Sequence, residues 1–275
     1  MKNPSLRRPG TSIRIFCLGR HYHIQQVGFS LVLIILLSGG CCPKIDHFLA
    51  YEPVPVHISP ENISFTDQFY KENQIGASVQ RVAAFANPVE KVHNDTLYKI
   101  RNRDHHLTAY YLESEVPAMD RTVLISNQFT NKKDQKIVVD TRPIWILVPT
   151  QKLYPNQHRP PRKLSHFVCY SIRQSGGGST EPVRLRDEFG PHSPVSVGRP
   201  MYLCNPATKF HNHRKFRPYN KRDHLVWYQV EEEFQQQVKL ENQMDSLKLD
   251  LRKISWLGVP STKKELDPTT PQENP

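Results

Sequence analysis

Short segments in which apolar and polar residues alternate recur along the chain, separated by polar or proline-rich stretches. The segments "VLISNQF", ending at Phe129, and "VRLRDEF", ending at Phe189, have the two-residue period of half-buried β-strands. The related segment "VKLENQM", ending at Met244, lies in a region rich in Glu, Gln, Leu and Lys that is typical of a helix by composition alone. Because equivalent segments fold alike, we predict a strand over residues 238–244 as well.

Each alternating segment belongs to a longer repeated pattern. A histidine stands four residues before a tyrosine in "HFLAY", "HLTAY", "HFVCY" and "HLVWY", and the four histidines are His47, His106, His166 and His224. The alternating segment follows about twenty residues later, and a third segment with a Pro-x-x-Lys tail follows that one. The tails end at Lys91, Lys152, Lys209 and Lys263. Three landmarks in the same order, four times, indicate four repeats of about 60 residues.

The repeats alternate in type, which suggests that a pair of copies was duplicated. The second segments carry, in chain order, Asp67, Asn127, Asp187 and Asn242. Copies one and three then have Asn-Pro in the third segment, and copies two and four have Val-Pro. The 23 prolines oppose helices in these segments. We therefore predict an all-β fold of two pseudo-duplicated β-barrel or β-sandwich modules, at residues 44–155 and 163–266, and a disordered tail at 267–275.

Two cysteines occupy corresponding places in the third copy. Cys169 lies three residues after the repeat histidine and Cys204 lies two before the proline. The same two positions in the other copies hold the pairs Ala50 and Ala86, Ala109 and Leu147, and Trp227 and Gly258. Copies that lack one of the two cysteines also lack the other. In the fourth copy the largest side chain, Trp227, is matched by the smallest residue, Gly258, as expected of two positions in contact. We predict a structural disulfide between Cys169 and Cys204.

The first 40 residues have the layout of a secretory signal peptide. A basic leader precedes the apolar run "VGFSLVLIILLSGG", and Cys41 follows directly. The small residues before Cys41 are similar to a lipoprotein signal, so Cys41 is the lipidation candidate, with simple cleavage near it as the alternative. Five of the 37 Lys/Arg and none of the 26 Asp/Glu lie in the leader. The remaining chain therefore carries +6, and we expect it to be exported, as a membrane-anchored lipoprotein or as a periplasmic or extracellular protein.

The remaining excess of positive charge is local. Residues 209–222, "KFHNHRKFRPYNKR", hold six Lys/Arg and no acidic residue. Such a loop can bind anionic polymers of the envelope or of the extracellular space. The alternative is that it is a solvated connection between two copies. The candidates for polyanion binding are Arg214, Lys215, Arg217, Lys221 and Arg222. His211 and His213 have the spacing that places two imidazoles on one face of a strand, but two imidazoles make a poor metal site without a third ligand.

The four repeat histidines are predicted to be structural. Catalysis rarely needs four equivalent sites, whereas a repeating fold needs one such contact in each copy. We expect each imidazole to hydrogen-bond an Asx side chain or a backbone carbonyl. The sequence contains no Gly-rich phosphate loop, no G-x-S-x-G and no His-Glu-x-x-His. We predict no catalytic residue, no metal and no cofactor, and binding to intracellular nucleic acid is not expected of an exported chain.

The segments "HFVCY", "VRLRDEFG", "VGRPMYLCNPATK", "DHLVWY" and "VKLENQ" resemble a family of uncharacterised tandem domains in exported bacterial and archaeal proteins. The resemblance is closest over residues 163–263 and weaker over 46–152, and this chain departs from it by lacking the cysteines in three of the four copies. It implies export and the disulfide, and it implies no activity. Two functions remain: a non-enzymatic structural or binding module of the envelope or extracellular space, and, as the alternative, an envelope-associated hydrolase with a site between the two repeat pairs.

Overall fold

The computed structural model describes residues 45–130 and 133–266. The predictions of a signal peptide at 1–40, of lipidation at Cys41 and of a disordered tail at 267–275 lie outside these residues. No helix in the described part of the chain is long and apolar enough to cross a membrane.

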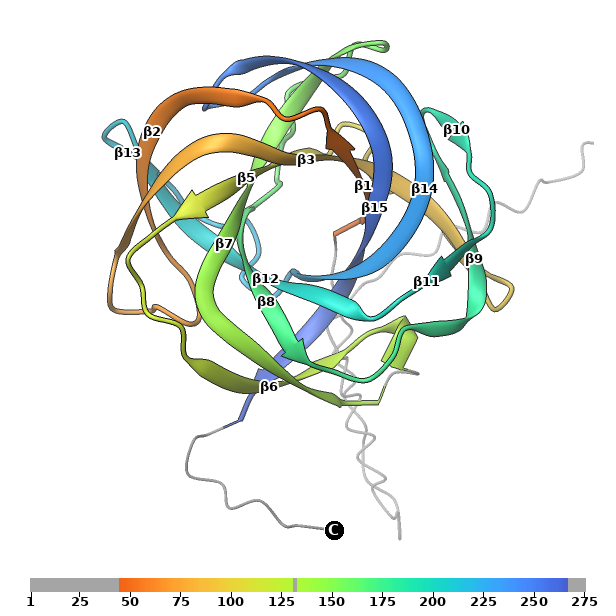
Figure 1. The fold of residues 1–275 in the computed structure, drawn as a ribbon, viewed down its shortest axis with the longest axis horizontal. Helices are drawn as coiled ribbons and strands as arrows, with labels where there is room; N and C mark the ends of the chain where they lie inside the picture. Colours follow the sequence, from red (N-terminus) through yellow and green to blue (C-terminus); the bar gives the residue numbers. More distant parts are fainter. Residues whose placement is uncertain (1–44, 131–132, 267–275) are drawn as a thin grey trace, which may run out of the picture. The chain divides into compact units, whose positions relative to one another are not determined.

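The described chain is almost entirely β-strand, with one short 3-10 helix, η1 (Gln128–Thr130) (Figure 1). The strands are β1 (His47–Pro53), β2 (His57–Thr66), β3 (Ile75–His93), β4 (Thr96–Tyr98), β5 (His106–Glu113), β6 (Asp120–Ser126), β7 (Gln135–Tyr154), β8 (His166–Gln174), β9 (Ser179–Asp187), β10 (Gly190–Pro191), β11 (Val195–Val197), β12 (Pro200–His211), β13 (Arg214–Phe216), β14 (His224–Glu241) and β15 (Ser246–Glu265). The strand predicted over residues 238–244 is present to Glu241 as the second half of β14. The all-β prediction is confirmed.

Eight strands pair in succession around a ring, in the order β1-β15-β14-β12-β8-β7-β5-β3, and β3 pairs with β1 again (Figure 1). Each copy supplies the strand that starts with its histidine and the strand that carries its Pro-x-x-Lys tail. All neighbours are antiparallel. The four histidine-bearing strands therefore run in the same direction and begin at one end of the ring, which we call the histidine end.

Small and very large side chains fill the inside of the ring. Trp145 on β7 and Trp256 on β15 come from opposite sides of the ring, and their ring centroids are 5.0 Å apart. Only a cavity of ≈ 10 Å³ remains beside them, which is about the minimum for one water molecule. The positions that the sequence paired by size are direct cross-strand neighbours here: Ala50 with Ala86, Ala109 with Leu147, Cys169 with Cys204, and Trp227 with Gly258. The predicted Cys169–Cys204 disulfide is present.

The second segment of each copy covers the outside of the ring. Each one pairs with the third strand of the copy two places away, and β2, β6 and β14 also pair with the third strand of their own copy. Thus β2 reaches β12, β9 reaches β3, β6 reaches β15, and the second half of β14 reaches β7. Copies one and three exchange their second segments, and so do copies two and four.

This exchange explains why the arrangement differs from two separate modules. A module made of copies one and two would leave the parts of β3 and β7 that pair with β9 and β14 uncovered, because those segments come from copies three and four. The four copies therefore share one sheet and one ring, to which each repeat pair contributes four strands.

Candidate functional site

The exchanged segments are attached by buried polar contacts between copies one and three. Asp67 accepts hydrogen bonds from the Tyr170 hydroxyl at 2.9 Å and from Asn205 Nδ2 at 2.9 Å. Asp187 in turn accepts hydrogen bonds from the Tyr51 hydroxyl at 2.5 Å and from the amide of Asn87. Burial raises the pKa of Asp67 above its usual range, against the hydrogen bonds that lower it.

Copies two and four use the neutral version of the same contact. Asn127 donates to the hydroxyls of Tyr228 and Ser261, at 3.0 and 2.9 Å. Asn242 likewise donates to the hydroxyls of Tyr110 and Thr150. A carboxylate can only accept, so it faces an asparagine amide, whereas the Asn amide needs a hydroxyl acceptor. The alternation of Asp with Asn-Pro and Asn with Val-Pro is thus a hydrogen-bonding requirement between exchanged segments.

The repeat histidines occupy four separate sites at the histidine end, and three of them contact the residue that follows an Asx residue. His47 contacts the Gln128 amide at 2.6 Å and His166 contacts Gln243 Oε1 at 3.2 Å, while His224 hydrogen-bonds the backbone of Cys204. Burial lowers the pKa of His47, His166 and His224 to about 3. Of the two predicted partners, the backbone is present at His224, and the Asx side chain is wrong for the other three, because it points to the tyrosine of the exchanged copy.

A buried lysine side chain accompanies each histidine. Lys91, Lys152 and Lys209 have no exposed surface, and 1% of the Lys263 side chain is exposed. The Lys91 ammonium lies 4.4 Å from the centre of the Phe129 ring, and the Lys263 ammonium lies 4.2 Å from that of Phe69, both in cation–π geometry. Burial lowers the pKa of Lys91 to about 7 and that of Lys263 to about 8. The sites of His47 and His166 are therefore closely packed clusters of histidine, lysine and glutamine.

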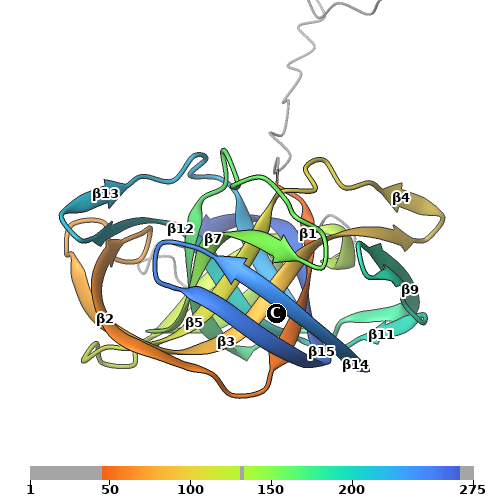
Figure 2. The ribbon, with the colours of Figure 1, turned by 90° about the horizontal axis from the view of Figure 1, so that it is seen from above.

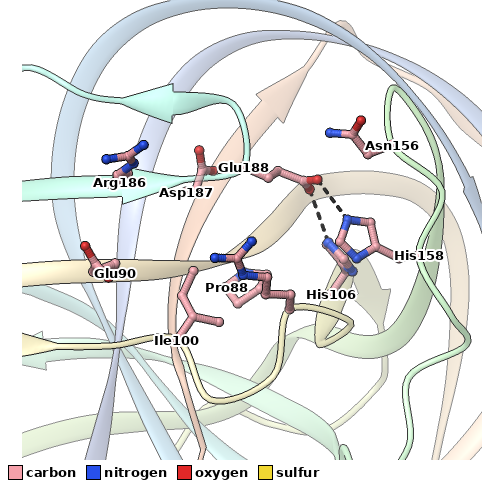
Figure 3. A pocket seen from close by; sticks show the side chains of 10 residues that line it. Pro88, Glu90, Ile100, His106, Asn156, His158, Arg186, Asp187 and Glu188 are labelled. Carbon is pink, nitrogen blue, oxygen red and sulfur yellow. Dashed lines mark hydrogen bonds and ion pairs between the residues drawn. The ribbon is translucent and has the colours of Figure 1, made fainter.

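The site of His106, in the second copy, differs from the other three because it contains a carboxylate. Glu188 occupies the position held by Gln68, Gln128 and Gln243 in the other copies. It contacts Lys152 Nζ in an ion pair, His106 Nε2 at 3.2 Å and His158 Nε2 at 2.9 Å (Figure 3). The hydrogen bonds and charges of these neighbours hold the pKa of Glu188 at about 2, although burial opposes this.

His158 enters this site from the linker between the repeat pairs. Its Nδ1 lies 3.2 Å from Asp104 Oδ1, so the ring stands between two carboxylates. Beside it is a pocket of ≈ 600 Å³. The lining residues come from copies one, two and three: Pro88, Glu90, Ile100, Arg103, His106, Asn156, His158, Arg186, Asp187 and Glu188. The pocket is thus lined by residues of both repeat pairs and of the linker between them.

His106, His158 and Glu188 are residue types that bind metals, but their surroundings fit a metal ion poorly. One ligand atom each from His106, His158 and Glu188 lie within 4.8 Å of one another. The ammonium of Lys152 contacts the same carboxylate and is itself buried. A divalent cation would have to displace this ammonium or lie against it, which costs more than the site gains. We therefore describe the cluster as an ion-pair network centred on Glu188.

The pocket offers carboxyl and imidazole groups. Its ten lining residues include Glu90, Asp187 and Glu188, with His106 and His158, and no serine, threonine, cysteine or tyrosine. A carboxyl group with a pKa of about 2 is a weak base, and Glu188 already accepts three contacts. Glu188 is therefore suited to an ion pair better than to general-base catalysis.

Positive charge is concentrated at the histidine end. The connections there, residues 94–105, 153–165 and 212–223, hold eleven Lys/Arg, and all eleven are exposed. They are Lys99, Arg101, Arg103, Arg159, Arg162, Lys163, Arg214, Lys215, Arg217, Lys221 and Arg222. The same segments hold three acidic residues, of which only Asp95 is exposed. The five residues predicted from the sequence are thus part of a wider surface, which we call the basic end.

The other end of the ring carries charges of both signs. Residues 113–120 and 229–237 contain six Asp/Glu and no Lys/Arg, and five of these six acidic residues are exposed. Asp120 and Glu231 lie 3.3 and 2.8 Å from the cations Arg173 and Lys253. The excess of exposed positive charge therefore lies at the basic end, and this end attracts a negatively charged surface or polymer more strongly than the other end does.

Two hairpins extend the basic end on opposite flanks of the ring (Figure 2). Asn94–Asp95 forms the turn between β3 and β4, and Asn212–His213 forms the turn between β12 and β13, all four with positive φ. His213 is therefore at an exposed turn, and His211 is buried with its Nε2 2.9 Å from Glu61 Oε2. The two imidazoles do not share one strand face, because His213 belongs to the turn itself.

Sequence reasoning missed the Glu188 network and the extent of the basic end. A signal for the network exists: Glu188 is the one acidic residue at a position that is Gln in the other three copies. Nothing in the linker pattern indicates that His158 folds back onto Glu188. The other six cations were missed because they lie in two further connections, 94–105 and 153–165, which the ring brings to the same end as 212–223.

The fold and the four equivalent sites define a repeat protein in which one polar cluster departs from the repeat. Residues 113–260 match the model of a family described as a repeat of unknown function, DUF7450. The match covers more than half of the chain, and the chain belongs to this family. No curated protein and no solved structure matches it.

Proposed function

We propose that the protein is an exported, non-enzymatic binding module of the cell envelope that attaches to an anionic surface through its basic end. The observation that carries the proposal is the arrangement of charge. Eleven exposed Lys/Arg from three connections share one end of the ring, and the same connections hold one exposed acidic residue, Asp95. The exposed cations repel one another, and this repulsion costs folding free energy. A negatively charged partner bound at the same end offsets that cost.

The repeat itself supports a binding role over an enzymatic one. The residues that recur in all four copies are buried and bonded to one another, so they serve the ring and leave the connections to vary. The connections are where the copies differ in charge and length. Rigid scaffolds with variable loops are typical of binding modules.

Export and anchoring remain part of this proposal, on the strength of the basic leader and the apolar run before Cys41. The intact mass of the protein from its native host tests them. A mass that starts at Cys41 with diacylglyceryl and acyl additions would establish a lipoprotein. An unmodified mass that starts nearby would establish a secreted or periplasmic protein.

The binding proposal is tested with dextran sulfate. This polyanion supplies negative charge and carries no nucleobase and no lipid. One variant removes four cations of the basic end: Lys215→Gln, Arg217→Gln, Lys221→Gln and Arg222→Gln. A matched control removes four cations from the other half of the ring: Arg81→Gln, Arg199→Gln, Arg252→Gln and Lys253→Gln. We expect the first variant to lose affinity by roughly 100-fold at low salt and the control to keep it. Equal affinities for the two variants would overturn the proposal.

The hydrolase alternative is favoured by one observation, the pocket between the repeat pairs with its unequal set of polar residues. Glu188→Gln reproduces the state of the other three copies and keeps the shape of the side chain. If the pocket is catalytic, this variant abolishes hydrolysis of envelope-derived esters or glycosides by the purified protein. If the first proposal holds, the unaltered protein shows no such turnover.

A further inference from the structure

Exposed apolar side chains accompany the cations of the basic end. Among the described residues, the exposed large hydrophobic side chains are Leu97, Met119, Tyr154 and Tyr219, with 45%, 52%, 45% and 61% of their surface accessible. Leu97 lies on β4, Tyr154 ends β7 and Tyr219 follows β13. Three of the four thus project from connections of the basic end, each from a different copy.

Tyr219 and Leu97 both stand close to cations. Lys163 Nζ lies 5.8 Å from the centre of the Tyr219 ring, and Tyr219 is followed by Lys221 and Arg222. Leu97 is two residues before Lys99. A polymer in water offers little to an exposed leucine. The boundary between headgroups and acyl chains takes up leucine and tyrosine side chains and attracts Lys and Arg to its phosphates.

The chain also enters the ring at this end. β1 begins at His47, at the histidine end, and Ile45 and Asp46 just before it are buried there. Cys41 is four residues before Ile45, a distance of at most about 14 Å. Any membrane attachment at Cys41 therefore lies within reach of the basic end.

We propose that the basic end docks on the surface of an anionic lipid bilayer, with Leu97, Tyr154 and Tyr219 inserted at the level of the headgroups. This inference rests on the proposed function and names its partner as a lipid surface. The cations supply long-range attraction, and the three apolar side chains supply the contact that a soluble polyanion does not offer. The opposite end of the ring then faces away from the membrane.

The experiment uses the chain from Cys41 onward with Cys41→Ser and Cys42→Ser, so that no lipid anchor contributes. Every strand and both apolar clusters lie within residues 45–266, so this chain contains the whole described fold. Binding is measured by flotation with vesicles of phosphatidylcholine alone and of phosphatidylcholine with 30 mol% (about one lipid in three) phosphatidylglycerol. We expect partition into the anionic vesicles only, and a fall in partition as salt is raised.

Two variants separate charge from insertion. The triple variant Leu97→Ser, Tyr154→Ser and Tyr219→Ser keeps every charge, and we expect it to lose vesicle binding by about tenfold or more while binding dextran sulfate normally. The four-charge variant of the basic end loses both activities, and the control variant of the other half keeps both. Far-UV circular dichroism and thermal unfolding show that each variant is folded.

The outcomes distinguish this inference from the proposed function. Binding to dextran sulfate without binding to anionic vesicles overturns the bilayer as the partner and leaves the anionic-surface proposal standing. Vesicle binding that the triple variant retains in full also overturns the inference, because attraction by charge alone needs no insertion. Absence of both kinds of binding overturns both proposals.

Discussion

Asp67 in the first copy accepts a hydrogen bond from the hydroxyl of Tyr170 in the third copy, 103 residues away along the chain. The reciprocal contact, from Tyr51 to Asp187, closes the exchange in the other direction. These two contacts fix the exchanged segments β2 and β9 on the outside of the ring. They make copies one and three a single cooperative unit, although they are not adjacent in sequence.

Substitutions should convert an exchange contact of the Asp type, such as that of Asp67, into the Asn type found at Asn127. Asp67→Asn alone brings an amide against the amide of Asn205 and should lower the free energy of unfolding by about 1–3 kcal/mol. Adding Asn205→Val and Ala207→Ser copies the arrangement around Asn127, where Val259 and Ser261 stand at these positions, and should restore most of the loss. Urea unfolding of the three combinations measures this as a double-mutant cycle.

The control for this conversion is Asn205→Val with Ala207→Ser while Asp67 is retained. It takes the amide away from the carboxylate and should be less stable than the full conversion. Simple additivity of the two sets of substitutions would contradict the account of the alternation given above.

Two of the buried lysines should respond in opposite ways to the same substitution. Lys91 Nζ has no hydrogen-bond partner among the described residues, whereas Lys152 is paired with Glu188. Lys91→Met should raise the free energy of unfolding at pH 6 by about 1–3 kcal/mol, since it removes an unpaired buried charge. Lys152→Met should lower it by about 3 kcal/mol, since it leaves the Glu188 carboxylate uncompensated.

The gain from Lys91→Met should depend on pH. The pKa of Lys91 is lowered to about 7 in the folded protein, from an ordinary value near 10.5 in the unfolded chain. Between these values the unfolded state binds more protons, so the unaltered protein gains stability as pH rises. Urea unfolding at pH 6 and pH 9.5 should therefore show a smaller difference between variant and parent at the higher pH. A constant difference would indicate that packing, not charge, sets the effect.

The sequence was sufficient to predict the local features of the fold. Periodicity and repetition predict the strands, and the matched sizes at positions 169 and 204 and in the sister copies predict the cross-strand neighbours, because those contacts lie within one copy. The exchange of segments between alternate copies was not predictable, since a strand's pattern specifies which face is buried and not which neighbour buries it. The Asp and Asn alternation contained that information, and its partners Tyr170 and Tyr228 become apparent only once the copies are placed in space.

Acid should unfold the protein through its buried histidines. The pKa of His47, His166 and His224 is about 3 in the folded state, below an ordinary value near 6.5, so protons bind the unfolded state first as pH falls through 6.5. Each of these histidines should remove about 2 kcal/mol of stability by pH 5. Glu188, with a pKa of about 2, acts in the same direction below its ordinary value near 4.5.

Thermal unfolding between pH 7 and pH 4 measures this effect as a fall in Tm that steepens below 6.5. The variant His166→Gln keeps a polar group for Gln243 and should flatten the curve by about a third. A Tm that stays constant from pH 7 to pH 4 would show that the imidazoles are not held neutral.

The tightest packing inside the ring is between Trp227 and Gly258, and it should tolerate change only as a pair. A Cβ atom on Gly258 would lie 2.8 Å from Cζ3 of the Trp227 indole, so Gly258→Leu should lower the free energy of unfolding by about 3 kcal/mol or more. Trp227→Ala alone leaves a cavity and should cost a similar amount. Together the two substitutions reproduce the Ala109 and Leu147 pair of the second copy, and the double variant should be more stable than either single one. Urea unfolding of the four proteins measures the coupling. If the two losses simply add, the volume of this position is not shared between the two strands, and the size matching seen across the copies has another cause.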